Sequence, residues 1–218
     1  MTARVLGVLG SIAALAAVLM LSAGRMNLPW FWAFLGVHGV LVAVQQVTID
    51  EGLRRERLEP GRGGCDRHLR RISFPFYLGH LIVTGLDAGR FHWSGPFPAT
   101  LQAGGLAGYA FGLGLAVWAM GVNRFFSPVA RIQHERGHRV INSGPYRFVR
   151  HPGYAGGLLA MLGGGIALGS WWSLVPLLPV ASLTLRRTFV EDRFLHDSLD
   201  GYGRYAQRVP RRLVPGVW

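Results

Sequence analysis

Residues 144–157, with the sequence GPYRFVRHPGYAGG, combine basic, aromatic and helix-initiating residues directly before an apolar segment. Pro152 disfavours helix at His151 and suits the first turn of a helix that begins there. The unpaired backbone N–H groups of that helix would face the preceding loop. An anionic group such as a carboxylate could bind these N–H groups, and the rings of Tyr146 and Tyr154 would attract a cation.

A second charged pair follows the apolar sequence. Arg187 and Glu191 are four residues apart, so they share one face if the last apolar helix continues past residue 185. The apolar runs 154–168 and 171–185 are separated by a two-residue turn, which predicts a tight helical hairpin. Because a hairpin returns its outer ends to one side, the pair should lie near Tyr154. The resulting pocket would suit a polar ligand that carries both signs of charge.

These groups must be positioned by helices, because apolar runs dominate the chain. Half of the residues are hydrophobic and 16% are charged, which is low for a soluble domain and typical of a membrane protein. Six apolar runs can be marked, at roughly 5–21, 30–49, 72–86, 101–122, 154–168 and 171–185. They predict an all-α fold, a polytopic integral membrane helical bundle of about six transmembrane helices that ends in the short hairpin and an amphipathic tail. The first run is expected to be a retained anchor, because the second follows after a short turn.

The positions of the 23 arginines predict the orientation of these helices. Seven lie in residues 51–71, six in 124–150 and seven from 186 to the end; with Arg4 these place 21 on one side of a six-span chain. Arg25 and Arg90 alone fall on the other side. The positive-inside rule therefore places both termini and both long loops in the cytoplasm, and with them the predicted pocket. We expect the protein to lie in the cell inner membrane. Tryptophans in the three opposite turns agree with this orientation.

The net charge of +12 does not indicate a nucleic-acid partner. The arginines lie between apolar runs and form no single basic face, so no nucleic acid is expected to bind. Cys65 is the single cysteine of the sequence, so no disulfide can form within it and no cysteine cluster can bind metal.

The sequence divides into two regions of one membrane domain. Residues 1–122 are predicted to be transmembrane scaffold helices, and residues 123–218 a binding loop, the hairpin and the tail. Polar residues of the scaffold would pair between helices or line a cavity; they are His38, Gln45, Gln46 and His80. The basic segment 54–71 is expected to be a solvated loop near anionic lipid headgroups. The tail would lie on the membrane surface or cover a site.

His134, Glu135 and His138 match the pattern H-E-x-x-H. On a helix the two histidines would share a face and could hold zinc, with the glutamate as the base of a membrane metalloprotease. Gly137 opposes a regular helix through the motif by about 1 kcal/mol. No third ligand follows at a helical offset, so the metalloprotease is an alternative and no metal is expected.

The run GHRVINSGPYRFVRHPGYAG, followed about 35 residues later by the acidic pair in FVEDRFL, resembles the membrane-embedded isoprenylcysteine carboxyl methyltransferase family. The wider group includes the phospholipid N-methyltransferases. Their shared pattern is R-H-P-x-Y-x-G, a hairpin, then an apolar residue and two acids. The resemblance covers about residues 123–218, and the preceding part of the chain resembles the family in hydrophobicity alone.

The resemblance implies that the hairpin binds S-adenosylmethionine. Carried over by position, the cofactor-binding residues would be Gln133, His138, Arg139, Val140, Ile141, Tyr146, His151, Pro152, Gly153, Tyr154 and Glu191. Gln133 is the nearest candidate for a family glutamine whose spacing differs. Arg187 matches a residue that the family assigns to the substrate and is the expected catalytic residue.

The charges of the predicted pocket suit this cofactor. Glu191 could accept hydrogen bonds from its ammonium or hydroxyl groups, and Arg187 could hold an acceptor carboxylate. We therefore expect an integral membrane methyltransferase acting on a lipophilic acceptor such as a prenylcysteine-like carboxylate. The alternatives are a phospholipid or small thiol or amine methyltransferase, a nicotinamide-dependent membrane reductase, the metalloprotease, and a non-catalytic scaffold or transporter. The expected partners are the lipid bilayer and the acceptor, with no obligatory protein partner.

Overall fold

The computed structural model describes residues 2–62, 64, 67–216 and 218, so Cys65 lies outside the described residues. The described chain is helical and contains no strand, which confirms the predicted all-α fold. Its elements are α1 (Thr2–Ala23), α2 (Pro29–Thr48), α3 (Glu51–Leu58), α4 (Arg67–Gly85), the π-helix η1 (Leu86–Phe91), α5 (Ala99–Val122), the 3-10 turns η2 (His134–Arg136) and η3 (Gly144–Arg147), α6 (Pro152–Ala167), α7 (Leu174–Ser198) and α8 (Tyr202–Arg208).

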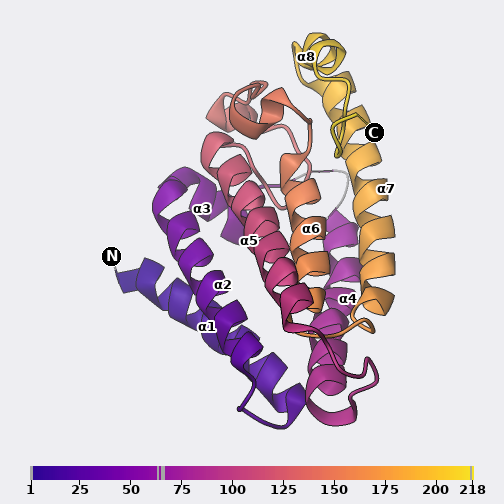
Figure 1. The fold of residues 1–218 in the computed structure, drawn as a ribbon. Coiled ribbons are helices and arrows are strands. Elements are labelled where there is room, and N and C mark those ends of the chain that lie inside the picture. Colours follow the sequence, from indigo (N-terminus) through magenta and orange to yellow (C-terminus); the bar gives the residue numbers. More distant parts are fainter. Residues whose placement is uncertain (1, 63, 65–66, 217) are drawn as a thin grey trace.

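Three helices of the described chain are long and apolar enough to cross a membrane, by length and composition. They are Arg4–Ala23 within α1, Pro29–Thr48 and Ala99–Val122. Helices α4, α6 and α7 run alongside them in one bundle (Figure 1). The structure therefore confirms a bundle with several membrane-length helices, and the count of six spans stays a prediction.

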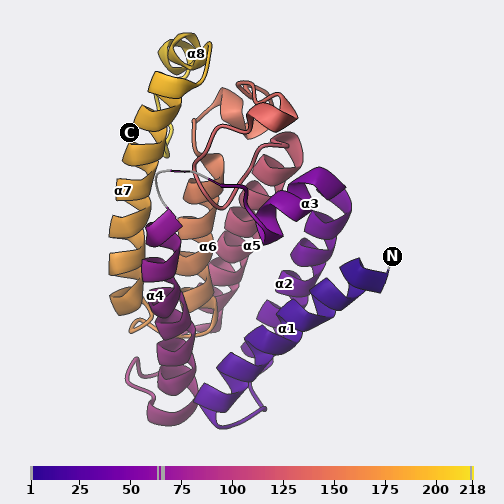
Figure 2. The same ribbon diagram turned by 180° about the vertical axis from the view of Figure 1, so that it is seen from behind.

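The loops gather at two ends of the bundle. Figures 1 and 2 show α3, the segment before α6, and α8 at one end, with the connections after α1, η1 and α6 at the other. At this second end the tryptophan-bearing turns meet, since Trp93 and Trp172 pack edge to face with ring centroids 5.9 Å apart. The buried carboxylate of Asp87 accepts from the hydroxyls of Ser94 and Ser170, at 2.5 and 2.6 Å, and so fixes the turn of the hairpin.

Helices α5 and α6 are in backbone contact. A Cβ atom added to Gly112 would lie 2.5 Å from the backbone nitrogen of Ala160, and one added to Gly156 would lie 2.5 Å from the carbonyl oxygen of Gly112. Small residues allow this approach between membrane helices. The contact holds the first turns of α6 against α5. It thereby also positions the hairpin mouth, defined as the start of α6 at Pro152 and the facing residues Arg187 and Glu191 of α7.

Gly112 supports a direct test of this packing. Leucine there would overlap the α6 backbone, which no side-chain rotation relieves, so Gly112→Leu should destabilise the protein by at least about 1–3 kcal/mol. Gly114→Leu is the matched control on the same helix, because nothing lies within 4 Å of a Cβ atom at Gly114. Thermal unfolding in detergent measures both variants. Equal unfolding temperatures would contradict the close contact.

Three of the four polar scaffold residues, His38, Gln45 and His80, pair between elements as predicted, and the role of Gln46 stays a prediction. His38 Nδ1 lies 2.7 Å from the hydroxyl of Tyr109, and Gln45 Nε2 lies 3.6 Å from the sulfur of Met120, which join α2 to α5. His80 Nδ1 lies 2.9 Å from the carbonyl of Ser173, which joins α4 to the start of α7.

The predicted solvated loop at 54–71 is wrong for its last residues, which belong to α4, and for its first residues. Helix α3 covers them and is capped by Asp50, whose carboxylate accepts from the N–H of Leu53 at 2.6 Å. Leu53 and Glu56 are buried, while Arg55 on the opposite face is exposed. The many arginines of this segment suggested a solvated loop. The three-residue spacing of the buried side chains Leu53 and Glu56, which indicates a helix, was not recognised among them.

Candidate active site

The hairpin mouth begins where the sequence places it. Gly144 has a left-handed backbone, with φ of 55°, and opens the 3-10 turn that buries Tyr146. Helix α6 then begins at Pro152, and the N–H of Tyr154 donates to the carbonyl of His151 at 3.1 Å. Helix α7 continues to Ser198, past the end of its apolar run, as the shared face of Arg187 and Glu191 required.

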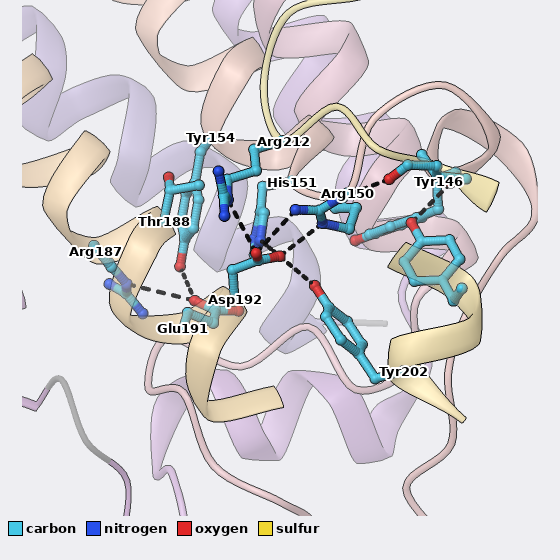
Figure 3. Close-up of polar contacts among 12 residues, drawn as sticks. Tyr146, Arg150, His151, Tyr154, Arg187, Thr188, Glu191, Asp192, Tyr202 and Arg212 are labelled. Atoms are coloured by element: carbon cyan, nitrogen blue, oxygen red, sulfur yellow. Dashed lines mark hydrogen bonds and ion pairs between the residues drawn. The ribbon is translucent and has the colours of Figure 1, made fainter. Parts of the chain in front are cut away.

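Tyr154, Arg187 and Glu191 converge at this mouth (Figure 3). The hydroxyl of Tyr154 donates a hydrogen bond to Glu191 Oε2. Arg187 Nε lies 3.9 Å from the same carboxylate oxygen, and its guanidinium carbon lies 5.4 Å from the centroid of the Tyr154 ring. The predicted approach of the two hairpin ends is therefore confirmed as geometry, and the chemical roles of the three residues stay predictions.

His151 pairs with Asp192 and not with Glu191. Its Nε2 lies 3.3 Å from Asp192 Oδ1, and the ring is buried. Asp192 also accepts from both Nε and Nη2 of Arg150, at 2.7 and 2.9 Å, from the hydroxyl of Tyr202 at 2.8 Å and from Arg212 Nε at 2.9 Å. Figure 3 shows these four side chains around one carboxylate. In the sequence, Asp192 had no predicted role beyond being the second acid of the motif.

Asp192 is held in its charged form. Burial opposes its ionisation, but hydrogen bonds from His151, Arg150 and Tyr202 outweigh burial and hold the pKa of Asp192 well below its usual range. The pKa of Arg150 is raised, because its hydrogen bonds to Asp192 outweigh the desolvation that burial causes. A charged network thus ties α6, α7, α8 and the tail together.

One pocket joins the loop, the hairpin and the tail. Nine of the predicted cofactor residues line it: His138, Arg139, Val140, Ile141, Tyr146, His151, Gly153, Tyr154 and Glu191. The other lining residues belong to the predicted loop, hairpin and tail but were not named individually as cofactor residues: Asn123, Phe125, Phe126, Ser127, Val129, Ala130, Arg131, Arg150, Leu195, Leu199, Tyr202 and Tyr205. Leu195, Leu199, Tyr202 and Tyr205 recur at roughly helical spacing in the tail, which indicated first a helix on the membrane surface and second a segment that covers a site.

Three predicted residues lie outside the pocket lining. Pro152 is buried at the start of α6, and Arg187 lies on the other side of Tyr154. Gln133 is fully buried; its Nε2 donates to the carbonyl of Phe125 at 2.8 Å, and its Oε1 accepts from Arg136 at 2.6 Å. Gln133 therefore braces the loop, and its placement among direct ligands is not supported by the pocket geometry.

His138 is a neutral ring at pH 7. Burial of the ring, together with the nearby positive charge of Arg131, lowers the pKa of His138 to about 4. Its Nδ1 accepts from the backbone N–H of Gln133 at 3.2 Å, and its ring packs on Phe125 with centroids 4.5 Å apart. The neutral ring therefore carries its proton on Nε2 and can donate a hydrogen bond.

The depressed pKa of His138 predicts a pH dependence. The unfolded state binds a proton at higher pH than the folded state, so the stability from neutral His138 is full above about pH 6.5 and declines as the pH falls toward about 4. We expect His138→Gln to flatten this part of the curve of unfolding temperature against pH. His134→Gln, at an exposed histidine of the same turn, should keep the wild-type slope. An unchanged slope in His138→Gln would contradict the assignment.

The H-E-x-x-H motif does not form a zinc helix. Residues His134–Arg136 make a single 3-10 turn, which ends at Gly137 with a φ of 63°. Glu135 is paired with Arg131 at 2.6 Å. Among residues 2–62, 64, 67–216 and 218, no group of three or more His, Cys, Asp or Glu side chains is placed to hold a metal ion. The metalloprotease alternative therefore gains no support.

Comparisons with known proteins bear on the same half of the chain. Residues 101–200 match the family model described as "Phospholipid methyltransferase". Two rice proteins, from Oryza sativa subsp. indica and subsp. japonica, are both described as "Probable protein-S-isoprenylcysteine O-methyltransferase" and are 39% identical over 93 residues. The alignment covers 39% of this chain and 46% of each relative, so the chain spans about half the length of the curated relatives it matches. The resemblance seen in the sequence is confirmed over this region.

Proposed function

We propose that this chain, whose residues 101–200 match the phospholipid methyltransferase family, is an integral membrane methyltransferase that uses S-adenosylmethionine and acts on a lipophilic acceptor. The observation that carries this proposal is the meeting of two cavities at Gly153 and Tyr154. The pocket described above lies on one side of them, and a groove between α4, α6 and α7 lies on the other. A donor and an acceptor could reach one another only where two such spaces meet.

The pocket fits the proposed cofactor in its polar part. Glu191 would accept from the ammonium group or the ribose hydroxyls, and Arg131 or Arg139 on the loop side would meet the carboxylate. The ring of Tyr154, backed by its hydrogen bond to Glu191, would lie near the sulfonium. When bound, S-adenosylmethionine supplies an electrophilic methyl group.

The pocket also offers apolar walls for a planar base. Val140 and Ile141 come from the loop, and Leu195 and Leu199 from α7 and its end. These residues belong to one cluster that also buries Tyr146. A flat apolar ring can bind among such side chains while the charged end of the same molecule meets Glu191.

The groove suits an amphiphilic acceptor. Its apolar walls are Phe74 and Tyr77 of α4, Leu158 of α6 and Leu183 of α7. Its polar lining residues are Arg71, Ser73, Thr184 and Arg187. We infer that an apolar tail occupies the groove and that the head of the acceptor lies beside Arg187, next to Tyr154.

The geometry favours an acceptor carboxylate. Arg187 is fixed by donating from Nη2 to the carbonyl of Pro128 at 2.7 Å, so its guanidinium is held at the mouth of the groove. A carboxylate held there could attack directly, with a new oxygen–carbon bond forming as the sulfur–carbon bond breaks and its electron pair stays on sulfur. The protein's task is then alignment in a site that excludes water.

A phospholipid amine is the second candidate, because the matching family model bears that name. A protonated amine must lose a proton before it attacks. The described residues that line the groove include no carboxylate and no histidine that could accept it. A carboxylate acceptor needs no such group and therefore ranks first.

We place the reaction at the cytoplasmic face of the inner membrane. The support is the arginine distribution, since 21 of 23 arginines would fall on one side of a chain with six spans. The pocket is lined by the loop before α6 and by α7 and α8, and these segments lie at one end of the bundle (Figure 1). The bilayer would then deliver the acceptor and the cytosol the cofactor.

Methyl transfer in vesicles tests the proposal. The purified chain is reconstituted and given S-adenosylmethionine with a labelled methyl group, together with a prenylated cysteine, the same compound with its carboxyl group esterified, phosphatidylethanolamine, or a lipophilic thiol. We expect label on the free carboxylate and none on its ester. Label on phosphatidylethanolamine alone would reverse the ranking, and absence of both cofactor binding and transfer would refute the proposed function.

A further inference from the structure

Helix α3 belongs to the part of the chain that the family match does not cover, yet it packs against the loop that forms the pocket (Figure 1). The contact centres on Glu56, which is buried, with 6% of its surface exposed. Oε1 of Glu56 accepts from the hydroxyl of Ser127 at 2.7 Å and from Arg131 Nε at 2.9 Å, and Oε2 accepts from Arg131 Nη2 at 2.6 Å. This two-pronged pairing fixes the guanidinium plane of Arg131.

The residues that Glu56 holds are walls of the pocket. Ser127 and Arg131 both line it, and so do Val129 and Ala130 between them. Apart from the 3-10 turn η2, the described segment from 123 to 143 has no helix or strand of its own. Its conformation therefore depends on such ties to other elements.

Helix α3 also contacts a second lining residue of the pocket, Phe126. The Phe126 ring packs against the cluster that buries Leu53, and the guanidinium carbon of Arg57 lies 5.6 Å from its centroid. On its other side this ring meets the first turn of α6, where a Cβ atom on Gly153 would lie 2.5 Å from Phe126 Cζ. Phe126 thus lies between α3 and the hairpin mouth.

The pair of Glu56 and Arg131 is ionised. Burial opposes the charge on Glu56, but hydrogen bonds from Arg131 and Ser127 outweigh it and lower the pKa of Glu56. Arg131 also binds Glu135 at 2.6 Å, and the Glu135 side chain is 57% exposed. Without the Glu56 carboxylate, the guanidinium would keep only this exposed partner and could move out of the pocket wall.

We infer that Glu56 is a positioning residue for the donor pocket, holding Ser127 and Arg131 in the arrangement that binds the cofactor. The inference rests on the proposed function for the identity of the ligand. It gives the N-terminal half a part in the site, where a purely scaffolding role would leave ligand affinity unchanged. A buried ion pair is weak evidence for stability by itself, so the effect is sought in binding.

Glu56→Gln is the test variant, because it keeps the shape and removes the charge. With the full chain in vesicles, we expect the Kd for labelled S-adenosylmethionine to rise about tenfold, which corresponds to about 1.4 kcal/mol. The rate at saturating cofactor should stay within about twofold, because Glu56 touches neither ligand. Glu56→Asp, which keeps the charge, should recover part of the affinity.

Glu51→Gln is the matched control on the same helix, since Glu51 is exposed and pairs with Arg54 and Arg55 on the outer face. It should bind the cofactor as the wild type does. Ser127→Ala removes one hydrogen bond and leaves the ion pair, so it keeps the test open if Glu56→Gln does not fold; a smaller rise in Kd is expected. If Glu56→Gln folds and binds the cofactor with the wild-type Kd, the inference is overturned. If Glu56→Gln does not fold, a wild-type Kd in Ser127→Ala overturns it in the same way. Either result leaves the proposed function intact. A wild-type chain that binds no cofactor would defeat the proposed function itself.

Discussion

Asp192→Ala should unfold or loosen the end of the bundle that holds the pocket, at a cost of about 3–5 kcal/mol. The reason is that Asp192 is the shared partner of Arg150 and Arg212, and the Arg150 side chain is only 5% exposed. Removing the carboxylate leaves this buried guanidinium without its ion-pair partner. The hydroxyl of Tyr202 and the ring of His151 lose an acceptor at the same time.

Thermal unfolding in detergent, with limited proteolysis of the tail, measures this loss. Asp197→Ala is the control, because Asp197 lies exposed on the same helix.

The pH dependence gives a second check. Since the folded pKa of Asp192 is depressed, its stabilising contribution is fully present above the unfolded pKa of about 4 and is lost progressively as the pH falls from there to the folded pKa. The difference between wild type and Asp192→Asn should therefore stay constant from pH 8 down to about 4. An unfolding temperature in Asp192→Ala equal to that of the control would show that the network contributes little.

Glu191→Gln should weaken binding of S-adenosylmethionine by about tenfold to a hundredfold, because hydrogen bonds to a charged group contribute about 1.5–3 kcal/mol. Glu191 lines the pocket and accepts a hydrogen bond from the hydroxyl of Tyr154. The substitution therefore removes a charged acceptor from both the ligand and the Tyr154 hydroxyl. Little loss of stability is expected, because glutamine keeps the shape of the side chain.

Tyr154→Phe separates the two parts of this effect. It keeps the ring beneath Arg187 and removes the hydroxyl that donates to Glu191. We expect a smaller loss of affinity than in Glu191→Gln, because the carboxylate remains available to the ligand. Equilibrium binding of labelled cofactor measures both variants. If Glu191→Gln binds as tightly as the wild type, the proposed orientation of the cofactor is wrong.

The hairpin mouth could be predicted because its signals are local. Pro152 marks the start of α6 by excluding the preceding residue from the helix, and the four-residue spacing of Arg187 and Glu191 places both on one helical face. A short turn then brings the two ends together, so Tyr154 and Glu191 meet. Each step depends only on backbone geometry over a few residues or on the return of one hairpin.

The partners of Asp192 and Gln133 could not be predicted in this way. The motif gave two adjacent acids, and only the packed structure decides that Glu191 faces the pocket while Asp192 turns toward Arg150 and His151. Successive residues on a helix point about 100° apart, but which direction is buried depends on what packs there. Gln133 was assigned to the ligand by position, and tertiary packing gives it the carbonyl of Phe125 instead.

The sequence by itself determined the helical class of the protein, the apolar lengths suited to a membrane and the residues at the hairpin mouth. These follow from hydropathy, helical periodicity and proline chemistry, which act over short stretches of chain. Only the tertiary structure decided that α3 supports one wall of the pocket through Arg131, because Glu56 and Arg131 are 75 residues apart. Each looks like an ordinary surface charge in the sequence. Their pairing exists because the packing of α2 against α5 brings their segments together, and no local pattern carries that information.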